Sequence, residues 1–299
     1  MIVGIAVALL ASSGGGMGAV REKFSSMFSL RKNPDISVAL PSDRDLDSQK
    51  PQEQAEILLE RAIARSAGAA SQIESRVEGW RGKLTWDSQL GQLITAALNS
   101  SDRSVRDSAI EVQLVAYGLT KNQSTVDALV RQADSPNHAR KIWALWNLGL
   151  LANRGIETDR VVRVLAAHLK GTDRGSDSSS FGRSALGNSS EDARRWAIEG
   201  LALVGTTSTI APLLQAMHDD PSPMVRERAA CSLAGSGMLS HDQRLIAVPQ
   251  LINYSNDPAL DAQTHGWAFQ ALGDITQQRL PNNSAAWRNW YQTSVVSDQ

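Results

Sequence analysis

Five histidines are the side chains of this sequence best suited to hold a transition metal, and they are His138, His168, His218, His241 and His265. Two imidazoles on one helix reach the same metal ion when they stand four residues apart. No His-x-x-x-His spacing occurs, and no histidine is followed by Glu. The sequence therefore predicts neither a metal site nor a cofactor.

The candidate nucleophiles are equally poor. The single cysteine, Cys231, stands in the small and apolar run 229–233, which predicts a core residue rather than a reactive thiol. Serines cluster within 172–190, but no Gly-x-Ser-x-Gly elbow and no paired base accompanies them. We expect no catalytic residue and no enzymatic activity. The serine-rich stretch is either a flexible surface loop or a loop that contacts a partner or is modified.

Tryptophans are the remaining side chains of interest, because Trp accounts for eight of the aromatic residues against four Phe and three Tyr. Large rings left at a surface are typical anchors for protein partners. Whether these rings are anchors or core residues depends on the elements that carry them.

The composition describes a folded chain with ample material for a real core. Its 299 residues carry a net charge of −1, and 42% of them are hydrophobic. This balance excludes disorder throughout, collagen, a disulfide scaffold and a polytopic membrane protein. A nearly neutral chain also lacks the excess of basic residues typical of nucleic-acid binders, so we expect no nucleic-acid partner.

Helical periodicity begins near Glu53 and continues to the end of the chain. Ile57, Leu58, Ala62 and Ile63 fall on one helical face, and no stretch alternates with a period of two. The sequence predicts an all-α protein with N-terminal helices over 53–85.

An internal repeat is the strongest signal beyond residue 86. Residues 143–149 resemble 267–273, and both resemble the runs that begin at Trp196 and Arg228. The register predicts five helices whose opening residues are Val105, Arg140, Ala193, Val225 and Thr264, spaced 35, 53, 32 and 39 residues apart. A further apolar helix precedes each of them, near 90–98, 126–133, 161–169, 210–217 and 245–254. Five helix pairs at this spacing indicate an α-solenoid. The long spacing assigns about eighteen extra residues, 172–190, to the third pair.

One run carries a family signature: Asp-Pro-Ser-Pro-Met-Val-Arg-Glu-Arg-Ala-Ala over 220–230, followed by Leu233. In this run, and over about 86–280, the chain resembles the HEAT-repeat family, specifically the type first noted in phycobilisome bilin lyases. It resembles a bacterial member of unassigned role. The resemblance implies a right-handed superhelix of about five helix pairs that serves as a binding scaffold.

The resemblance also raises three activities that are found in HEAT-like proteins. A lyase or chromophore-binding subunit stays an alternative, supported by the shared repeat alone. Di-iron hydroxylases of this fold bind iron through His-Glu pairs, which are missing here. DNA glycosylases of a HEAT-like fold use a basic surface, but the bases at these helix starts are interleaved with acids such as Asp107 and Glu227. That interleaving favours an Asp–Arg ladder between repeats.

Three tryptophans occupy one repeat position, three residues after the helix opener, at the border of the core stripe. The hypothesis is that Trp143, Trp146, Trp196 and Trp267 form part of a peptide- or protein-binding groove on the concave face. The alternative is that they fill gaps between stacked repeats. In the C-terminal segment 281–299, a cap that seals the stack is predicted to contain Trp287, Trp290 and Tyr291.

The N-terminal segment 1–20 holds no charged residue and is followed by Arg21 and Lys23. We expect a hydrophobic anchor in a single-pass membrane protein with a cytoplasmic body, joined to it by a disordered linker over 21–52. The alternatives are a cleaved signal peptide, giving an exported periplasmic protein that begins near Gly14, and a mis-set start. The predicted function is a membrane-tethered, non-enzymatic scaffold for a protein or peptide partner.

Overall fold

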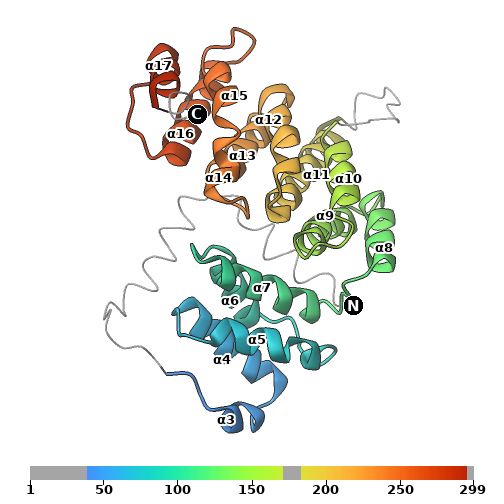
Figure 1. Cartoon of the computed structure of the whole chain (residues 1–299). Coiled ribbons are helices and arrows are strands. Elements are labelled where there is room, and N and C mark those ends of the chain that lie inside the picture. Colours follow the sequence, from blue (N-terminus) through green and yellow to red (C-terminus); the bar gives the residue numbers. More distant parts are fainter. Residues whose placement is uncertain (1–38, 171–182, 295–299) are drawn as a thin grey trace. The chain divides into compact units, whose positions relative to one another are not determined.

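The computed structural model describes residues 39–170 and 183–294, and the chain divides into two compact units between Thr120 and Lys121. Within the described residues, helices alternate with turns and no strand occurs (Figure 1). The all-α prediction is confirmed.

The N-terminal unit is built around one central helix. Its elements are α3 (Asp43–Asp47), α4 (Pro51–Ile63), α5 (Ala69–Arg76), the 3-10 helix η2 (Val77–Trp80), α6 (Ser88–Leu98) and α7 (Arg103–Ala116). Helix α4 packs against α5, α6 and α7. Trp80 is buried there, and its indole Nε1 donates a hydrogen bond to Gln54 Oε1 at 3.0 Å. The Trp86 ring stacks on Tyr117 with 4.6 Å between centroids, and burial raises the pKa of Tyr117 to about 12.

Part of the predicted linker 21–52 is ordered helix. Helix α3 and the start of α4 lie within it, while residues 21–38 are outside the described residues. Leu46 has no exposed surface, and the Arg76 guanidinium pairs with Asp43 at 2.9 Å and with Asp47. A single buried leucine and one arginine therefore tie this segment to α5.

The C-terminal unit holds four successive helix pairs. Its elements are α8 (Gln123–Ala133), α9 (His138–Asn153), α10 (Thr158–Leu169), α11 (Arg183–Val204), η3 (Thr207–Thr209), α12 (Ile210–Asp219), α13 (Pro223–Ala234), α14 (His241–Leu245), α15 (Val248–Tyr254), α16 (Ala262–Thr276) and α17 (Ser284–Ser294). The pairs are α8–α9, α10–α11, α12–α13 and α15–α16, and the second helices pack on one another in the order α9, α11, α13, α16. This arrangement confirms the α-solenoid. The remaining predicted pair, α6–α7, belongs to the N-terminal unit.

The predicted openers of α9, α13 and α16 lie two residues after the first helical residue, whereas α11 begins ten residues before the predicted opener Ala193. Local signals mark the three helix starts that agree. Asn137 and Asp261 cap α9 and α16 by accepting hydrogen bonds from the backbone N–H groups of Arg140 and Thr264, and Pro223 opens α13. The predicted extra segment 172–190 is divided: residues 183–190 are the first turns of α11, and 171–182 lie outside the described residues.

Arg244 closes the far end of α13. Its side chain is buried and its guanidinium donates hydrogen bonds to the backbone oxygens of Ser232, Leu233, Gly235, Gly237 and Leu239 at 2.7–3.4 Å. The last turn of a helix leaves its carbonyl groups without intrahelical partners. One side chain from α14 therefore satisfies the C-terminal end of α13 and fixes the turn that follows.

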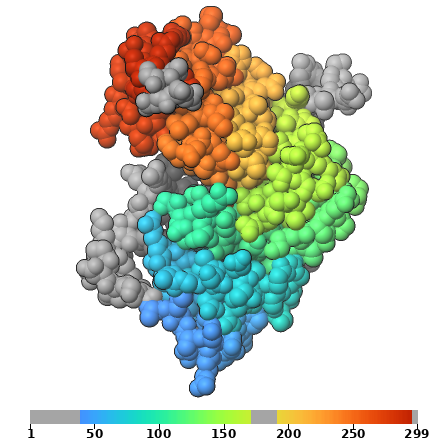
Figure 2. Space-filling model, viewed as in Figure 1, coloured from blue at the N-terminus to red at the C-terminus, as the bar shows by residue number. Residues whose placement is uncertain are grey.

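A glycine pair allows α9 and α11 to touch. A Cβ at Gly149 would overlap the carbonyl oxygen of Gly200, and a Cβ at Gly200 would lie 2.7 Å from the Leu145 oxygen. The two helices therefore pack backbone to backbone at this point. On the face shown in Figure 2, side chains close the spaces between the ribbons of the C-terminal unit.

The prediction of a single-pass membrane protein is corrected. Over 39–170 and 183–294, no helix combines the length and the apolar character that a bilayer crossing requires. Residues 1–20, on which the prediction rested, are not among those described.

We predict that Gly149→Ala destabilises the protein by about 1–3 kcal/mol, because the new methyl group forces α9 away from α11. Gly266→Ala is the matched control: it lies in α16, is exposed, and a Cβ there meets nothing within 4 Å. The control should be neutral or stabilising by up to about 1 kcal/mol, since Ala favours helix over Gly. Urea unfolding monitored by circular dichroism measures both. Equal changes in the two variants would contradict the backbone contact.

Candidate partner-binding face

Two side-chain positions recur on the second helices of the C-terminal unit, three and six residues after each opener. Because α9, α11, α13 and α16 pack in succession, these positions follow one another from helix to helix. We call them the Trp stripe, which consists of Trp143, Trp146, Trp196, Glu199, Arg228, Cys231, Trp267 and Gln270.

The first two helices of the stripe contribute an aromatic pair. Trp146 meets Trp196 edge to face, with ring centroids 5.7 Å apart and an interplanar angle of 77°. Trp196 is 7% exposed, while Trp146 is half-buried. The Nε1 atom of Trp146 is shielded from solvent and has no hydrogen-bond acceptor among the described residues.

The third helix replaces tryptophan by a charged pair. Arg228 occupies the repeat position of Trp143 and Trp196, and its Nη2 atom donates to Glu199 Oε2 at 2.5 Å. Both side chains are at least four-fifths buried, with 16% and 20% of their surfaces exposed. Burial acts to lower the pKa of Arg228, but the Glu199 carboxylate outweighs it and the net shift is upward. The Glu199 carboxylate thus favours the charged form of Arg228.

Cys231 lies one turn beyond Arg228 and is half-buried rather than a core residue. Burial raises the pKa of its thiol, the Arg228 charge opposes that shift, and the carboxylates of Glu227, Asp274 and Glu199 add to it. A thiol with a raised pKa is a weak nucleophile at neutral pH. Cys231 is therefore unsuited to catalysis.

The four predicted anchors do not share one environment. Trp143 and Trp267 are half-buried like Trp146, whereas Trp196 is buried. Trp146 shares its contact surface with Trp196, whose ring it meets edge to face. The partner-binding role of the four residues stays a prediction.

Sequence reasoning missed the charged pair within the stripe. Arg228 was visible in the register as the counterpart of Trp143 and Trp196, but its partner is 29 residues away on another helix. Glu199 stands at the repeat position of Trp146. An acid and a base at the two repeat positions of neighbouring helices are the signal in the sequence that predicts this pair.

Two ion pairs of the predicted Asp–Arg ladder join neighbouring repeats of the C-terminal unit. The Arg194 guanidinium donates two hydrogen bonds to Asp220, at 2.7 and 3.1 Å, and the Asp220 side chain is 2% exposed. In the next repeat, Arg226 donates to Asp261 at 2.6 Å and to the Thr264 hydroxyl at 3.0 Å. These bases therefore bind acids of neighbouring repeats.

The predicted cap lies on α17, which packs against α15. Trp287 is 1% exposed and its Nε1 atom donates to the Pro281 oxygen at 3.1 Å. Trp290 meets the Trp287 ring edge to face at 5.9 Å, and Tyr291 is half-buried. Their assignment as a cap of the stack stays a prediction.

The described residues contain no group of three or more His, Cys, Asp or Glu that could hold a metal ion.

In comparisons with known proteins, residues 154–234 and 179–273 match the family model for HEAT repeats. The matched segments contain α11 and α13 and reach into α16. No curated protein matches the chain.

We predict that Trp146 and Trp196 are energetically coupled. In a double-mutant cycle with Trp→Phe at each position, the coupling free energy should be about 0.5–1.5 kcal/mol, the range for edge-to-face aromatic pairs. Chemical unfolding of the two single variants and the double variant measures it. Pairing Trp146→Phe with Trp287→Phe, on α17, is the control and should be additive. Additivity in both cycles would contradict the coupling.

Proposed function

We propose that this HEAT-repeat protein is a scaffold that binds a protein partner along the Trp stripe of its C-terminal unit. Proteins built from HEAT repeats are commonly interaction scaffolds and typically have no catalytic activity. The repeat match over 154–273 supports the general role. The partly exposed tryptophans of the Trp stripe support the choice of this face of the C-terminal unit.

The observation that carries the proposal is that Trp143, Trp146 and Trp267 stay partly exposed at corresponding places on the second helices α9 and α16. A ring that is already packed on one edge keeps a fixed orientation, and it loses its remaining contact with water when a partner covers it. Such preordered aromatic residues account for much of the binding free energy at protein interfaces.

The geometry favours an extended segment of the partner. Packed helices lie about 8–10 Å apart, so the four second helices span about 25 Å. An extended chain advances about 3.3 Å per residue and covers that span with about eight residues. The Glu199–Arg228 pair neutralises its own charges in the middle of the stripe. We therefore expect the bound segment to be neutral or apolar where it crosses α11 and α13.

The proposal is tested by site-specific photo-crosslinking in the cells that make the protein. A benzophenone side chain replaces Gln270, which is exposed on the stripe three residues from Trp267. The matched control carries it at Gln215, which is exposed on the first helix α12. We predict a discrete protein adduct at position 270 and none at 215.

Trp267→Ala in the 270 variant should then reduce the adduct several-fold, because the ring that anchors the segment is gone. Equal adducts at the two positions, or an adduct indifferent to Trp267→Ala, would contradict the proposed face. Circular dichroism of the Trp267→Ala variant shows that the loss is not caused by unfolding.

A further inference from the structure

One imidazole lies between two carboxylates that belong to successive repeats. His218 is the second-last residue of α12, and its Nδ1 atom lies 2.5 Å from Asp219 Oδ1. Its Nε2 atom lies 3.2 Å from Asp257 Oδ2, in the turn after α15. The imidazole therefore bridges the pair α12–α13 to the pair α15–α16.

The number of hydrogen bonds in this arrangement depends on the protonation state of the ring. A neutral imidazole has one N–H group, so it can donate to one of the two carboxylates while a lone pair faces the other. A protonated imidazole donates to both. Two hydrogen bonds to carboxylates are thus available only to the charged ring, and the bridge between the repeats depends on the proton.

The carboxylate on the second repeat is held in place independently of His218. Asp257 Oδ1 accepts a hydrogen bond from the Ala259 backbone N–H at 2.9 Å, and the Asp257 carbonyl oxygen lies 2.8 Å from Nε2 of His265. The first of these bonds, followed by the His218 side chain, lowers the pKa of Asp257. Asp257 is therefore an ionised and preoriented acceptor at neutral pH.

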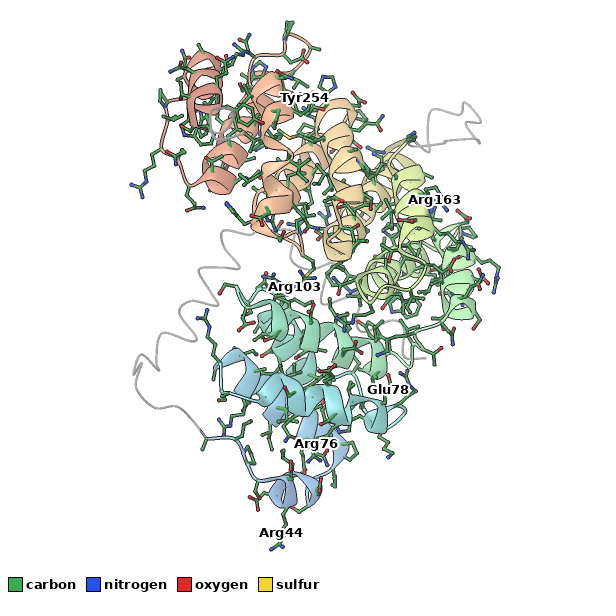
Figure 3. All side chains as sticks on the ribbon, viewed as in Figure 1. Arg44, Arg76, Glu78, Arg103, Arg163 and Tyr254 are labelled. Carbon is green, nitrogen blue, oxygen red and sulfur yellow. The ribbon has the colours of Figure 1, made fainter. Side chains whose placement is uncertain are left out.

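An aromatic ring covers the imidazole from the neighbouring helix. Tyr254, labelled on α15 in Figure 3, lies 4.9 Å from His218 between ring centroids. Its hydroxyl donates to the Leu214 oxygen on α12 at 3.3 Å, and burial chiefly raises its pKa. The titratable groups around His218 are thus Asp219 on α12, Tyr254 on α15, Asp257 in the turn and His265 on α16.

We propose that His218 is a proton-controlled clamp between the helix pairs α12–α13 and α15–α16, closed when its ring is protonated and released when the ring is neutral. The clamp joins α12 to the turn between α15 and α16. The Tyr254 side chain also contacts α12, through its hydroxyl and its ring, and this contact does not depend on the His218 proton.

The direction of the pH dependence follows from the two carboxylates. The hydrogen bond with Asp219 is the largest influence on the pKa of His218, and with Asp257 it outweighs the opposing effect of burial, so the pKa is raised above 6.5. A raised pKa in the folded state means that the stabilisation is fully present below about pH 6.5, the unfolded value, and is lost as the pH rises through the folded value. The clamp therefore closes on mild acidification.

Hydrogen exchange of the full chain tests the clamp. After correction for intrinsic exchange, protection of the α15–α17 amides should fall between about pH 6 and about pH 8, by up to about tenfold for each unit that the pKa exceeds 6.5. His218→Gln should remove this pH dependence. His241→Gln is the control, because His241 is exposed and the substitution removes the same titrating group; it should behave as the wild type.

A second measurement covers the case in which His218→Gln unfolds. The ring proton resonances of His218, followed by NMR, should titrate above pH 6.5, and Asp257→Asn should lower that midpoint while an Asn side chain still caps Ala259. A wild-type midpoint at or below about 6.5 overturns the proposal. So does protection of α15–α17 that is unaffected by pH, or that loses its pH dependence equally in His241→Gln.

Discussion

The backbone contact between α9 and α11 sets the spacing on which the rest of the C-terminal unit depends. Gly149 and Gly200 leave no side chain between the two helices, and the Leu165 side chain of α10 also packs close to Gly200. Glycine inside a helix costs about 1 kcal/mol relative to alanine. Close packing must offset that cost here. Trp146 and Trp196 stand about one turn away on the same helices, so their rings meet because the backbones touch.

Several charged residues of the repeats form ion pairs with one another within the stack. Asp220 illustrates this, since its carboxylate binds Arg194 from the preceding repeat and also accepts the Ser222 backbone N–H at 2.9 Å. Arg228 and Glu199 are paired in the same way on the stripe. With 30 basic and 31 acidic residues in the whole chain, no large excess of either sign is left to attract a partner over a distance. Recognition at the Trp stripe would therefore depend on shape and on the burial of aromatic rings.

The sequence was sufficient for whatever is encoded locally. Caps such as Asn137 and Asp261, and the proline at the start of α13, place the helices within a few residues, and the repeat then assigns them to pairs. What could not be read were contacts between residues distant in the chain. Leu46 stands among Asp and Ser in the predicted polar linker, and only its partners on other helices explain why its side chain is buried.

The same limit applies to the candidate sites. Trp146 and Trp196 could be assigned to one border of the helices, but the edge-to-face contact that buries one of them depends on the crossing of α9 and α11. His218 gave no signal at all, because one of its two carboxylates is 39 residues away and reaches it through the solenoid repeat. The division at Thr120 was equally hidden, since α6 and α7 continue the repeat but pack on α4.

Helix α16 is held to the preceding repeat by two contacts of different chemistry. At its start, Arg226 of α13 binds Asp261 and Thr264, and a guanidinium stays charged at every physiological pH. In the turn before it, His218 binds Asp257 through an imidazole that titrates. Loss of the second contact alone would leave α16 attached to α13, and α15 would keep the hydrogen bond from Tyr254 to the Leu214 oxygen on α12. Trp267 lies on α16, one turn after the arginine contact, which does not depend on the His218 proton. Proton control would therefore act first on the C-terminal end of the stack and leave the order of the Trp stripe intact.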